Sequence, residues 1–251
     1  MSAPAVDKSG HRIRQMFGAI AGWYDFLNHF LSLGIDIWWR KKTVTTVSPK
    51  GSAPILDVCT GTGDLAIAYW YAGDQKLAVT GSDFTPQMLD KARLKGHRAR
   101  TDSSTAELTF VEADTTQLPF PSDQFQIVSV AFGIRNVTDY QAGIREMIRV
   151  CQPGGRVAIL EFSRPTNSLL GKLYLFYFRQ ILPRLGQLFS RNDQSAYNYL
   201  PASVLQFPSG PEFEQELRNC GLIEVRSCPM TFGICTLYYG EKPGKQNSAN
   251  L

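Results

Sequence analysis

The chain has 251 residues, of which 43% are hydrophobic and 19% are charged. These values are typical of one globular domain with a sizeable core and exclude a largely disordered protein. The formal net charge of +4 is too small to indicate nucleic-acid binding by itself. The five cysteines are widely scattered and predict neither a disulfide framework nor a metal site. No apolar signal segment follows Met1, so we expect a cytoplasmic protein.

The two ends of the chain, residues 1–12 and 241–251, are polar and predict flexible tails around a single domain of residues 13–240. Within that domain, residues 13–50 show a helical pattern rich in aromatic residues, which Ser32-Leu-Gly34 breaks in two. This segment precedes the first predicted strand. It therefore predicts a helical lid over a pocket or a helix packed on the core, and the two interpretations are compatible.

The stretch Ile55–Asp64 predicts a strand, a tight glycine turn and the start of a helix. Gly61 and Gly63 let the backbone turn sharply and let a ligand come close, because they have no Cβ. Asp57 stands beside the turn, where a carboxylate would repel a pyrophosphate but can pair with a cation. The third glycine of a dinucleotide site is replaced by Ala66. We therefore expect S-adenosylmethionine (SAM), which carries a sulfonium and an ammonium and no phosphate.

Helices and strands alternate after this turn, which predicts a parallel sheet covered on both faces, with the ligand at the carboxyl ends of its strands. Two closing strands are too close together for a helical crossover, so we expect them to be antiparallel. The predicted helices are 65–71, 86–95, 140–150 and 212–220, and the predicted strands are 77–82, 108–111, 126–132, 156–162, 222–227 and 233–240, with a break at Gln152-Pro-Gly-Gly155.

Polar residues follow the carboxyl ends of four predicted strands. Asp83 stands at the distance from the glycine turn where an acid binds ribose hydroxyls, although it could instead cap a helix. Asp114 stands where an acid accepts a hydrogen bond from an adenine amino group. The alternative for Arg135 is a surface ion pair. The residues expected at this pocket are Asp83, Asp114, Thr115, Arg135, Asn136 and Glu161.

Residues 168–189 are apolar almost all round, but four charged or proline residues interrupt them too often for a transmembrane helix. They predict a hydrophobic helical insertion over residues 163–205, which is buried by the lid, forms a wall for an isoprenoid tail or dips into a bilayer. Two basic patches, Arg40-Lys41-Lys42 and Lys91–Arg100, are typical of solvated surface, and an anionic membrane surface is the alternative partner for both.

These motifs together resemble the quinone-ring C-methyltransferases of menaquinone and ubiquinone biosynthesis, the UbiE/MenG-like family, over about residues 17–240. The resemblance and the strand pattern imply the α/β, Rossmann-like fold of class I SAM-dependent methyltransferases. Phe132-Gly-Ile-Arg135-Asn136-Val137 is the most diagnostic motif. The others are Trp23-Tyr24-Asp25-Phe-Leu-Asn28, Ser32-Leu-Gly34 with Trp39, Asp57 through Gly61-Thr62-Gly63-Asp64, Leu118-Pro-Phe, Pro153-Gly-Gly, Glu161-Phe-Ser-Arg-Pro, and Tyr197-x-Tyr199-Leu200 followed by Ser203.

The resemblance implies an enzyme that methylates a ring carbon of a polyprenylated naphthoquinol, demethylmenaquinol, with a benzoquinol precursor of ubiquinone as the alternative. Gln206-Phe-Pro-Ser-Gly favours the menaquinone members. Arg135 would stabilise the developing oxyanion, because an arginine almost never loses its proton. Asn136 would orient the ring, and Asp25, Tyr199 or a water would accept the proton. The SAM-binding residues would be Tyr24, Asp57, Gly61, Thr62, Gly63, Asp83, Asp114 and Thr115, and Ala131 replaces the family's usual serine.

Two other functions fit the sequence less well. A nucleic-acid methyltransferase should carry Asn/Asp-Pro-Pro-Tyr/Phe or a Pro-Cys nucleophile after the fourth strand, where this chain has Phe-Gly-Ile-Arg. A non-catalytic SAM-binding subunit would not need Arg135 and Asn136. We expect no metal and no nucleic-acid partner. The sequence leaves open a homodimer and a transient contact with the inner face of the cell membrane.

Overall fold

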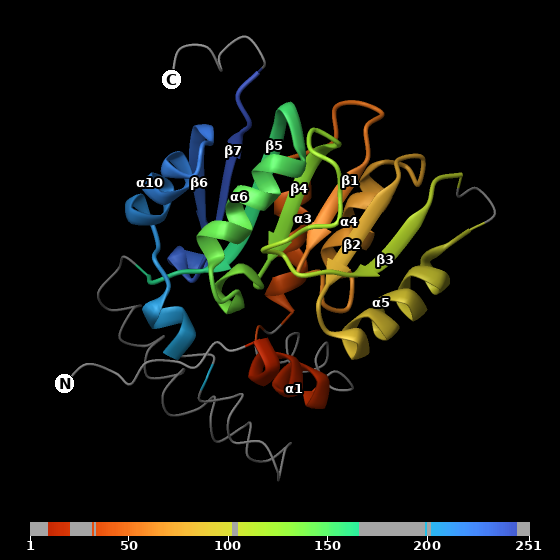
Figure 1. Ribbon diagram of the computed structural model, residues 1–251, viewed down its shortest axis with the longest axis horizontal. Helices are drawn as coiled ribbons and strands as arrows, with labels where there is room; N and C mark the ends of the chain where they lie inside the picture. Colours follow the sequence, from red (N-terminus) through yellow and green to blue (C-terminus); the bar gives the residue numbers. More distant parts are fainter. Residues whose placement is uncertain are drawn as a thin grey trace.

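The computed structural model describes residues 10–20, 32, 34–101, 105–165, 199 and 202–244. They build one seven-stranded sheet with the order β3-β2-β1-β4-β5-β7-β6 (Figure 1). Strands β1 to β5 pair in parallel, and β7 runs antiparallel to both neighbours, β5 and β6. This confirms the predicted sheet. The strands are β1 (Ile55–Val58), β2 (Val79–Asp83), β3 (Leu108–Glu112), β4 (Phe125–Ala131), β5 (Cys151–Phe162), β6 (Ile223–Met230) and β7 (Cys235–Glu241).

Helices cover both faces of the sheet and enclose two hydrophobic cores. α3 (Ile35–Thr46), α4 (Asp64–Ala72) and α5 (Pro86–Ala99) pack on one face, and α6 (Tyr140–Val150) and α10 (Pro211–Asn219) pack on the other. Figure 1 shows α6 in front of the sheet and α3 and α4 behind it. α1 (Gly10–Ile20) lies beyond the carboxyl ends of the strands. The three-layer arrangement leaves that edge of the sheet available for a ligand.

The central strands have the sequence that a sheet covered on both faces requires. All four residues of β1 are buried, and so are the first six residues of β4. Strands of this kind are continuous apolar runs instead of alternating ones, because each face meets a helix layer. Asp139 caps α6 by accepting a hydrogen bond from the backbone nitrogen of Ala142 at 2.9 Å. The buried strands therefore position the turns at the carboxyl edge of the sheet.

The predicted break at Gln152-Pro-Gly-Gly155, before a strand at 156–162, is wrong. β5 begins at Cys151 and includes these four residues. The sheet pairing is nevertheless irregular there: Phe125 pairs with Cys151, and Ile127 pairs with Arg156. The backbone nitrogen of Lys242 donates to the carbonyl oxygen of Gly155 at 2.9 Å. Ordered structure thus continues beyond residue 240, and α1 likewise begins before residue 13, at Gly10.

α3 packs on the core, which fits one of the two interpretations of the segment 13–50. Trp39 and Val44 are buried among residues of α4 and the sheet. Arg40 and Asp36 form a buried ion pair one turn apart on the same helix. Of the helices that the structure describes, none is long and apolar enough to span a membrane. Residues 168–189, and most of the predicted insertion, lie outside the described residues.

Candidate active site

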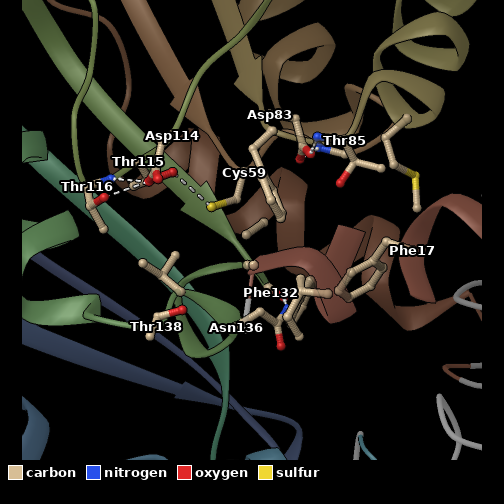
Figure 2. A pocket seen from close by; sticks show the side chains of 18 residues that line it. Phe17, Cys59, Asp83, Thr85, Asp114, Thr115, Thr116, Phe132, Asn136 and Thr138 are labelled. Atoms are coloured by element: carbon tan, nitrogen blue, oxygen red, sulfur yellow. Dashed lines mark hydrogen bonds between the residues drawn. The ribbon is translucent and has the colours of Figure 1, made fainter. Parts of the chain in front are cut away.

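The turn after β1 forms the floor of a pocket at the carboxyl edge of the sheet (Figure 2). Cys59 and Gly61 both line the pocket and both have positive φ angles, 48° and 55°. The backbone nitrogen of Thr60 donates to the carbonyl oxygen of Ser82 at 2.9 Å, which ties the turn to β2. The turn thus presents backbone close to a ligand, as the glycine pattern predicts.

Asp83, the last residue of β2, is fixed on one wall of this pocket. Its carboxylate accepts hydrogen bonds from the backbone nitrogens of Gly61 and Thr85, each at 2.9 Å. Burial raises the pKa of this carboxyl above its usual value, and the two backbone donors partly offset that rise. The geometry leaves Asp83 facing the pocket as an acceptor for ligand hydroxyls.

Asp114 and Thr115 stand on the opposite wall, with Cys59 between them and Asp83 in Figure 2. Oδ1 of Asp114 accepts from the backbone nitrogen and the hydroxyl of Thr116, at 2.8 and 2.7 Å. Oδ2 of Asp114 has no hydrogen-bond donor among the described residues. The hydroxyl of Thr115 lies 3.2 Å from Sγ of Cys59. Because burial raises the pKa of the Cys59 thiol, this group is neutral and no nucleophile.

The charge of the described pocket lining disfavours a phosphate-bearing ligand. Asp83 and Asp114 are the charged residues of its described lining, which contains no lysine, arginine or histidine. Helix α4 begins beside the glycine turn with an acid, Asp64, which pairs with Lys95. A pyrophosphate would meet repulsion here, whereas a cationic ligand without phosphate would be attracted.

Three residues expected to contact SAM, namely Asp57, Thr62 and Gly63, do not line the pocket in the described structure. Asp57 is buried, where it accepts hydrogen bonds from the hydroxyls of Thr60 (2.6 Å) and Ser129 (2.8 Å). Desolvation raises the pKa of Asp57 to about 7. Thr62 is also buried, and its hydroxyl accepts from Nζ of Lys95 at 3.2 Å. Both side chains thus make hydrogen bonds that support the glycine turn instead of lining the pocket.

Gly63 is required for packing, because a side chain has no room there. Its φ angle is 88°, and a Cβ placed there would lie 2.9 Å from the ring of Phe110 and 3.1 Å from Cβ of Ala92. This glycine lets α4 begin close to β3 and α5. A contact between Gly63 and a cofactor stays a prediction.

Asn136 lines the pocket on the side of α1, and its orientation is fixed by two contacts. Its Oδ1 accepts a hydrogen bond from the hydroxyl of Tyr199 at 3.0 Å, and its Nδ2 lies 3.5 Å from the carbonyl oxygen of Phe132. Tyr199 is buried against Ile13 and Met16 of α1. The structure thus brings together two of the expected catalytic residues, which are 63 positions apart in the chain.

Arg135 differs from the expectation that it stands at the pocket mouth. Its side chain is buried, and Arg135 is not among the described residues that line the pocket. Nη1 donates to Oε1 of Glu161 and to the carbonyl oxygen of Phe132, each at 2.6 Å. The guanidinium also lies 5.3 Å from the ring centre of Phe162. The alternative of an ion pair is correct, but the pair is buried instead of exposed.

α1 supplies one wall of the pocket through Gly10, Ile13 and Phe17. Arg14 on the same helix pairs with Glu112 at the end of β3, with Nη2 and Oε1 2.6 Å apart. This half of the predicted lid therefore lies over the site. Tyr24 and Asp25, which were expected to bind SAM and to accept a proton, lie outside the described residues.

Sequence reasoning assigned no role to Cys59 and no partner to Glu161. Cys59 stands between the first strand and Gly61, and this place in the glycine turn could have suggested contact with a ligand. Glu161 was recognised at a strand end, but the spacing of residues does not reveal a pairing between β5 and the turn after β4. Ala131, which replaces the usual serine, does line the pocket.

Comparison with solved structures supports the fold. A SAM-dependent methyltransferase from Thermotoga maritima superposes with a TM-score of 0.63 over 91% of this chain and 98% of its own, at 16% identity. A phosphoethanolamine N-methyltransferase from Haemonchus contortus, solved with SAM, gives 0.57 over 87% of this chain and 59% of its own, also at 16% identity. At such identities the likeness establishes the class I methyltransferase fold alone.

The sequence comparisons are more specific. A ubiquinone/menaquinone biosynthesis C-methyltransferase from Geobacter sp. (strain M21) is 43% identical over 95% of this chain and 99% of its own. Demethylmenaquinone methyltransferases from Deinococcus radiodurans and Thermus thermophilus are 42% and 41% identical, over 95% and 91% of this chain and 97% and 100% of theirs. Residues 5–242 match the model of the ubiE/COQ5 methyltransferase family. The chain therefore belongs to the ubiE/COQ5 methyltransferase family.

Proposed function

We propose that this enzyme binds SAM and transfers its methyl group to a ring carbon of demethylmenaquinol, a polyprenylated naphthoquinol, to give menaquinol. The observation that carries the proposal is the pocket at the carboxyl edge of the sheet. Its described lining holds two carboxylates and no basic side chain, which suits a cationic ligand without phosphate. Family membership and relatives described as demethylmenaquinone methyltransferases support the choice of acceptor.

We assign each polar residue of the pocket to one part of SAM. Asp83 would accept hydrogen bonds from the ribose hydroxyls, and Oδ2 of Asp114 would accept one from the adenine amino group. Gly61 would let the backbone approach the methionine part, and Thr115 would contact the adenosine. Tyr24, which lies outside the described residues, stays a prediction for the same site.

SAM supplies an electrophilic methyl group: the bond from a ring carbon to the methyl forms while the sulfur–methyl bond breaks, and the ring then loses a proton. Asn136 would orient the acceptor, because it lines the pocket and Tyr199 fixes Oδ1. Nδ2 carries two N–H groups, so one can donate to a ring oxygen while the other points to the carbonyl oxygen of Phe132. Asp25, Tyr199 or a bound water would accept the proton. Rate would come mainly from alignment in a pocket that excludes water.

Arg135 would act on the pocket and not as a free base. Its guanidinium is held by Glu161 and by the carbonyl oxygen of Phe132, whose own side chain lines the pocket. The pair thereby fixes the turn that carries Asn136. We therefore treat Arg135 and Glu161 as positioning residues, while a direct electrostatic effect of Arg135 on a developing oxyanion stays a prediction.

The polyprenyl tail of the acceptor implies that the enzyme works at a membrane surface. A substrate with a long isoprenoid chain resides in a bilayer, so a cytoplasmic enzyme must meet it at the inner face of the cell membrane. Residues 163–205 would form the apolar wall for that tail.

The acceptor can be tested with purified protein, SAM that carries a labelled methyl group, and reduced acceptors in detergent. We expect label in demethylmenaquinol and at least about tenfold less in the benzoquinol precursor of ubiquinone. Equal transfer to both would assign a dual quinone specificity. Label in RNA, or SAM binding without transfer to any quinol, would contradict the proposal and favour an RNA methyltransferase or an accessory subunit.

A further inference from the structure

Helix α3 exposes apolar side chains where a core-packed helix normally exposes polar ones. One face of α3 is buried on the sheet through residues such as Trp39 and Val44. Beside and beyond that face, Ile35, Ile37 and Trp38 are 36%, 58% and 50% exposed. Single exposed apolar residues are common on protein surfaces, but three within the first four positions of one helix indicate an interaction surface.

A second site with an exposed apolar residue is the turn η3 (Thr231–Gly233), which joins β6 to β7. Phe232 is 72% exposed, the most among the large hydrophobic residues that the structure describes. Its φ is 58°, and Thr231 and Gly233 are also left-handed, at 47° and 83°. Left-handed backbone is unfavourable for a bulky residue and is retained mainly where function requires it. The strain here holds a phenyl ring out in solvent.

The two exposed sites belong to one surface. Nε1 of Trp39 donates a hydrogen bond to the hydroxyl of Thr231 at 2.8 Å. Trp39 follows Trp38 and Thr231 precedes Phe232, so this bond connects the two exposed sites. The ring of Trp39 also packs against Phe162 at the end of β5, with ring centres 6.0 Å apart. The surface therefore lies at the carboxyl edge of the sheet, the edge that carries the pocket.

The charge beside this surface is positive. Lys41 and Lys42 are exposed on the next turn of α3. The one acid of α3, Asp36, is buried and paired with Arg40, so it does not offset the lysines. An apolar belt containing tryptophan, followed by lysines, is the pattern of a protein surface that lies in the interface of an anionic bilayer.

We propose that the α3–η3 face, formed by Ile35, Ile37, Trp38, Lys41, Lys42 and Phe232, docks on a bilayer that contains anionic lipid. The apolar side chains enter the headgroup region, and the two lysines meet lipid phosphates. This docking turns the pocket edge toward the membrane. The inference rests on the proposed function in one respect, because the bilayer is where a polyprenylated acceptor resides.

α5 offers a competing face on the other end of the sheet. Leu94 is 47% exposed there, next to exposed basic residues such as Lys91 and Arg98. This face has one exposed large apolar residue, whereas the α3–η3 face has four. Leu94 therefore provides a matched control for a basic helix with exposed apolar surface.

The test uses the full-length protein and cosedimentation with two kinds of vesicle, pure phosphatidylcholine and an equal mixture of phosphatidylcholine and phosphatidylglycerol. The variant Ile37→Ser/Trp38→Ser/Phe232→Ser should bind the mixed vesicles at least about tenfold more weakly. Lys41→Gln/Lys42→Gln should lose about tenfold on the mixed vesicles and little on pure phosphatidylcholine. Leu94→Ser should bind like the unmodified protein.

The proposal is overturned if the unmodified protein does not bind the mixed vesicles, or if Leu94→Ser weakens binding as much as the triple variant. Self-association through this face without vesicle binding would also overturn it and assign the face to a second copy. Methyl transfer to a short-tailed acceptor in detergent should be unchanged in the triple variant. Because vesicle binding needs no SAM, a failure of the proposed activity would be visible separately.

Discussion

Nη1 of Arg135 donates to Oε1 of Glu161 at 2.6 Å, and both side chains are buried between β5 and the turn after β4. The same Nη1 donates to the carbonyl oxygen of Phe132 at 2.6 Å. Nε of Arg135 has no hydrogen-bond partner among the described residues. One buried ion pair thus connects the frame of the sheet to the turn that carries Asn136.

Glu161→Gln should leave the buried guanidinium without its counter-charge. We expect the free energy of unfolding to fall by about 3 kcal/mol, since breaking one side of a buried pair is costly. We also expect kcat to fall at least about tenfold while the SAM dissociation constant changes little. Asp83 and Asp114, which would bind SAM, make their hydrogen bonds to residues other than Arg135 and Glu161. Arg135→Ala should likewise keep SAM binding and lose turnover by orders of magnitude. Denaturant titration, calorimetry and steady-state kinetics measure the three quantities.

The matched control is Arg226→Gln, which breaks the exposed pair with Glu224 at 3.4 Å. Its effect on unfolding should be between zero and about 1 kcal/mol. If Glu161→Gln lowers stability but leaves kcat and KM for the quinol unchanged, the pair is structural and the positioning role is wrong.

Asp83→Asn should weaken SAM binding by at least about tenfold, because a neutral amide makes weaker hydrogen bonds to ribose hydroxyls than a carboxylate does. Isothermal titration calorimetry with SAM measures the change. Asp90→Asn on the exposed surface of α5 is the control and should bind SAM normally. Unchanged affinity in Asp83→Asn would place the ribose elsewhere.

Gly133→Ala should distort the pocket floor, because a Cβ on Gly133 would lie 2.4 Å from Cβ of Cys59. We expect a loss of about 1–3 kcal/mol in the free energy of unfolding and weaker SAM binding. Cys59→Gly removes the opposing Cβ, and the φ of 48° at this position suits glycine. The double variant should therefore recover part of both losses, which a pair of thermal melts and titrations would reveal; simple additivity would exclude the steric explanation.

Asp57 should make stability depend on pH. Burial raises its pKa from 3.8 to about 7, so the folded protein keeps this proton in the range where the unfolded chain loses it. The free energy of unfolding should consequently fall as pH rises from about 4 to about 7, by on the order of a few kcal/mol from this group. Asp57→Asn should lack this part of the decline. Urea titrations of both proteins across that range test it, and parallel curves would contradict the assignment.

The fold could be predicted largely from sequence, because short local patterns mark its strands and turns. The apolar runs of β1 and β4 and the turn at Gly61 mark buried parallel strands and a ligand-binding edge. The short connection between the last two strands indicates an antiparallel pair. The start of β5 was missed because Pro-Gly-Gly normally ends a strand, whereas here the irregular stretch is held by backbone bonds to Lys242, far along the chain.

The site was predictable only in part, because strand ends give position but not side-chain direction. Asp83, Asp114, Thr115 and Asn136 do face the pocket. Asp57 was expected there as well, yet its hydrogen bonds to Thr60 and Ser129 turn it into the core. Such choices depend on partners from other strands, which no local pattern in the sequence specifies.

The most direct test of the central claim is turnover by the isolated chain. Purified protein would be mixed with SAM that carries a deuterated methyl group and with demethylmenaquinol kept reduced in detergent, and the extracted quinone would be analysed by mass spectrometry. We predict menaquinone with the intact labelled methyl on its ring, formed many times per enzyme and lost in Arg135→Ala. Unlabelled or unchanged quinone, in a preparation that binds SAM, would contradict the account.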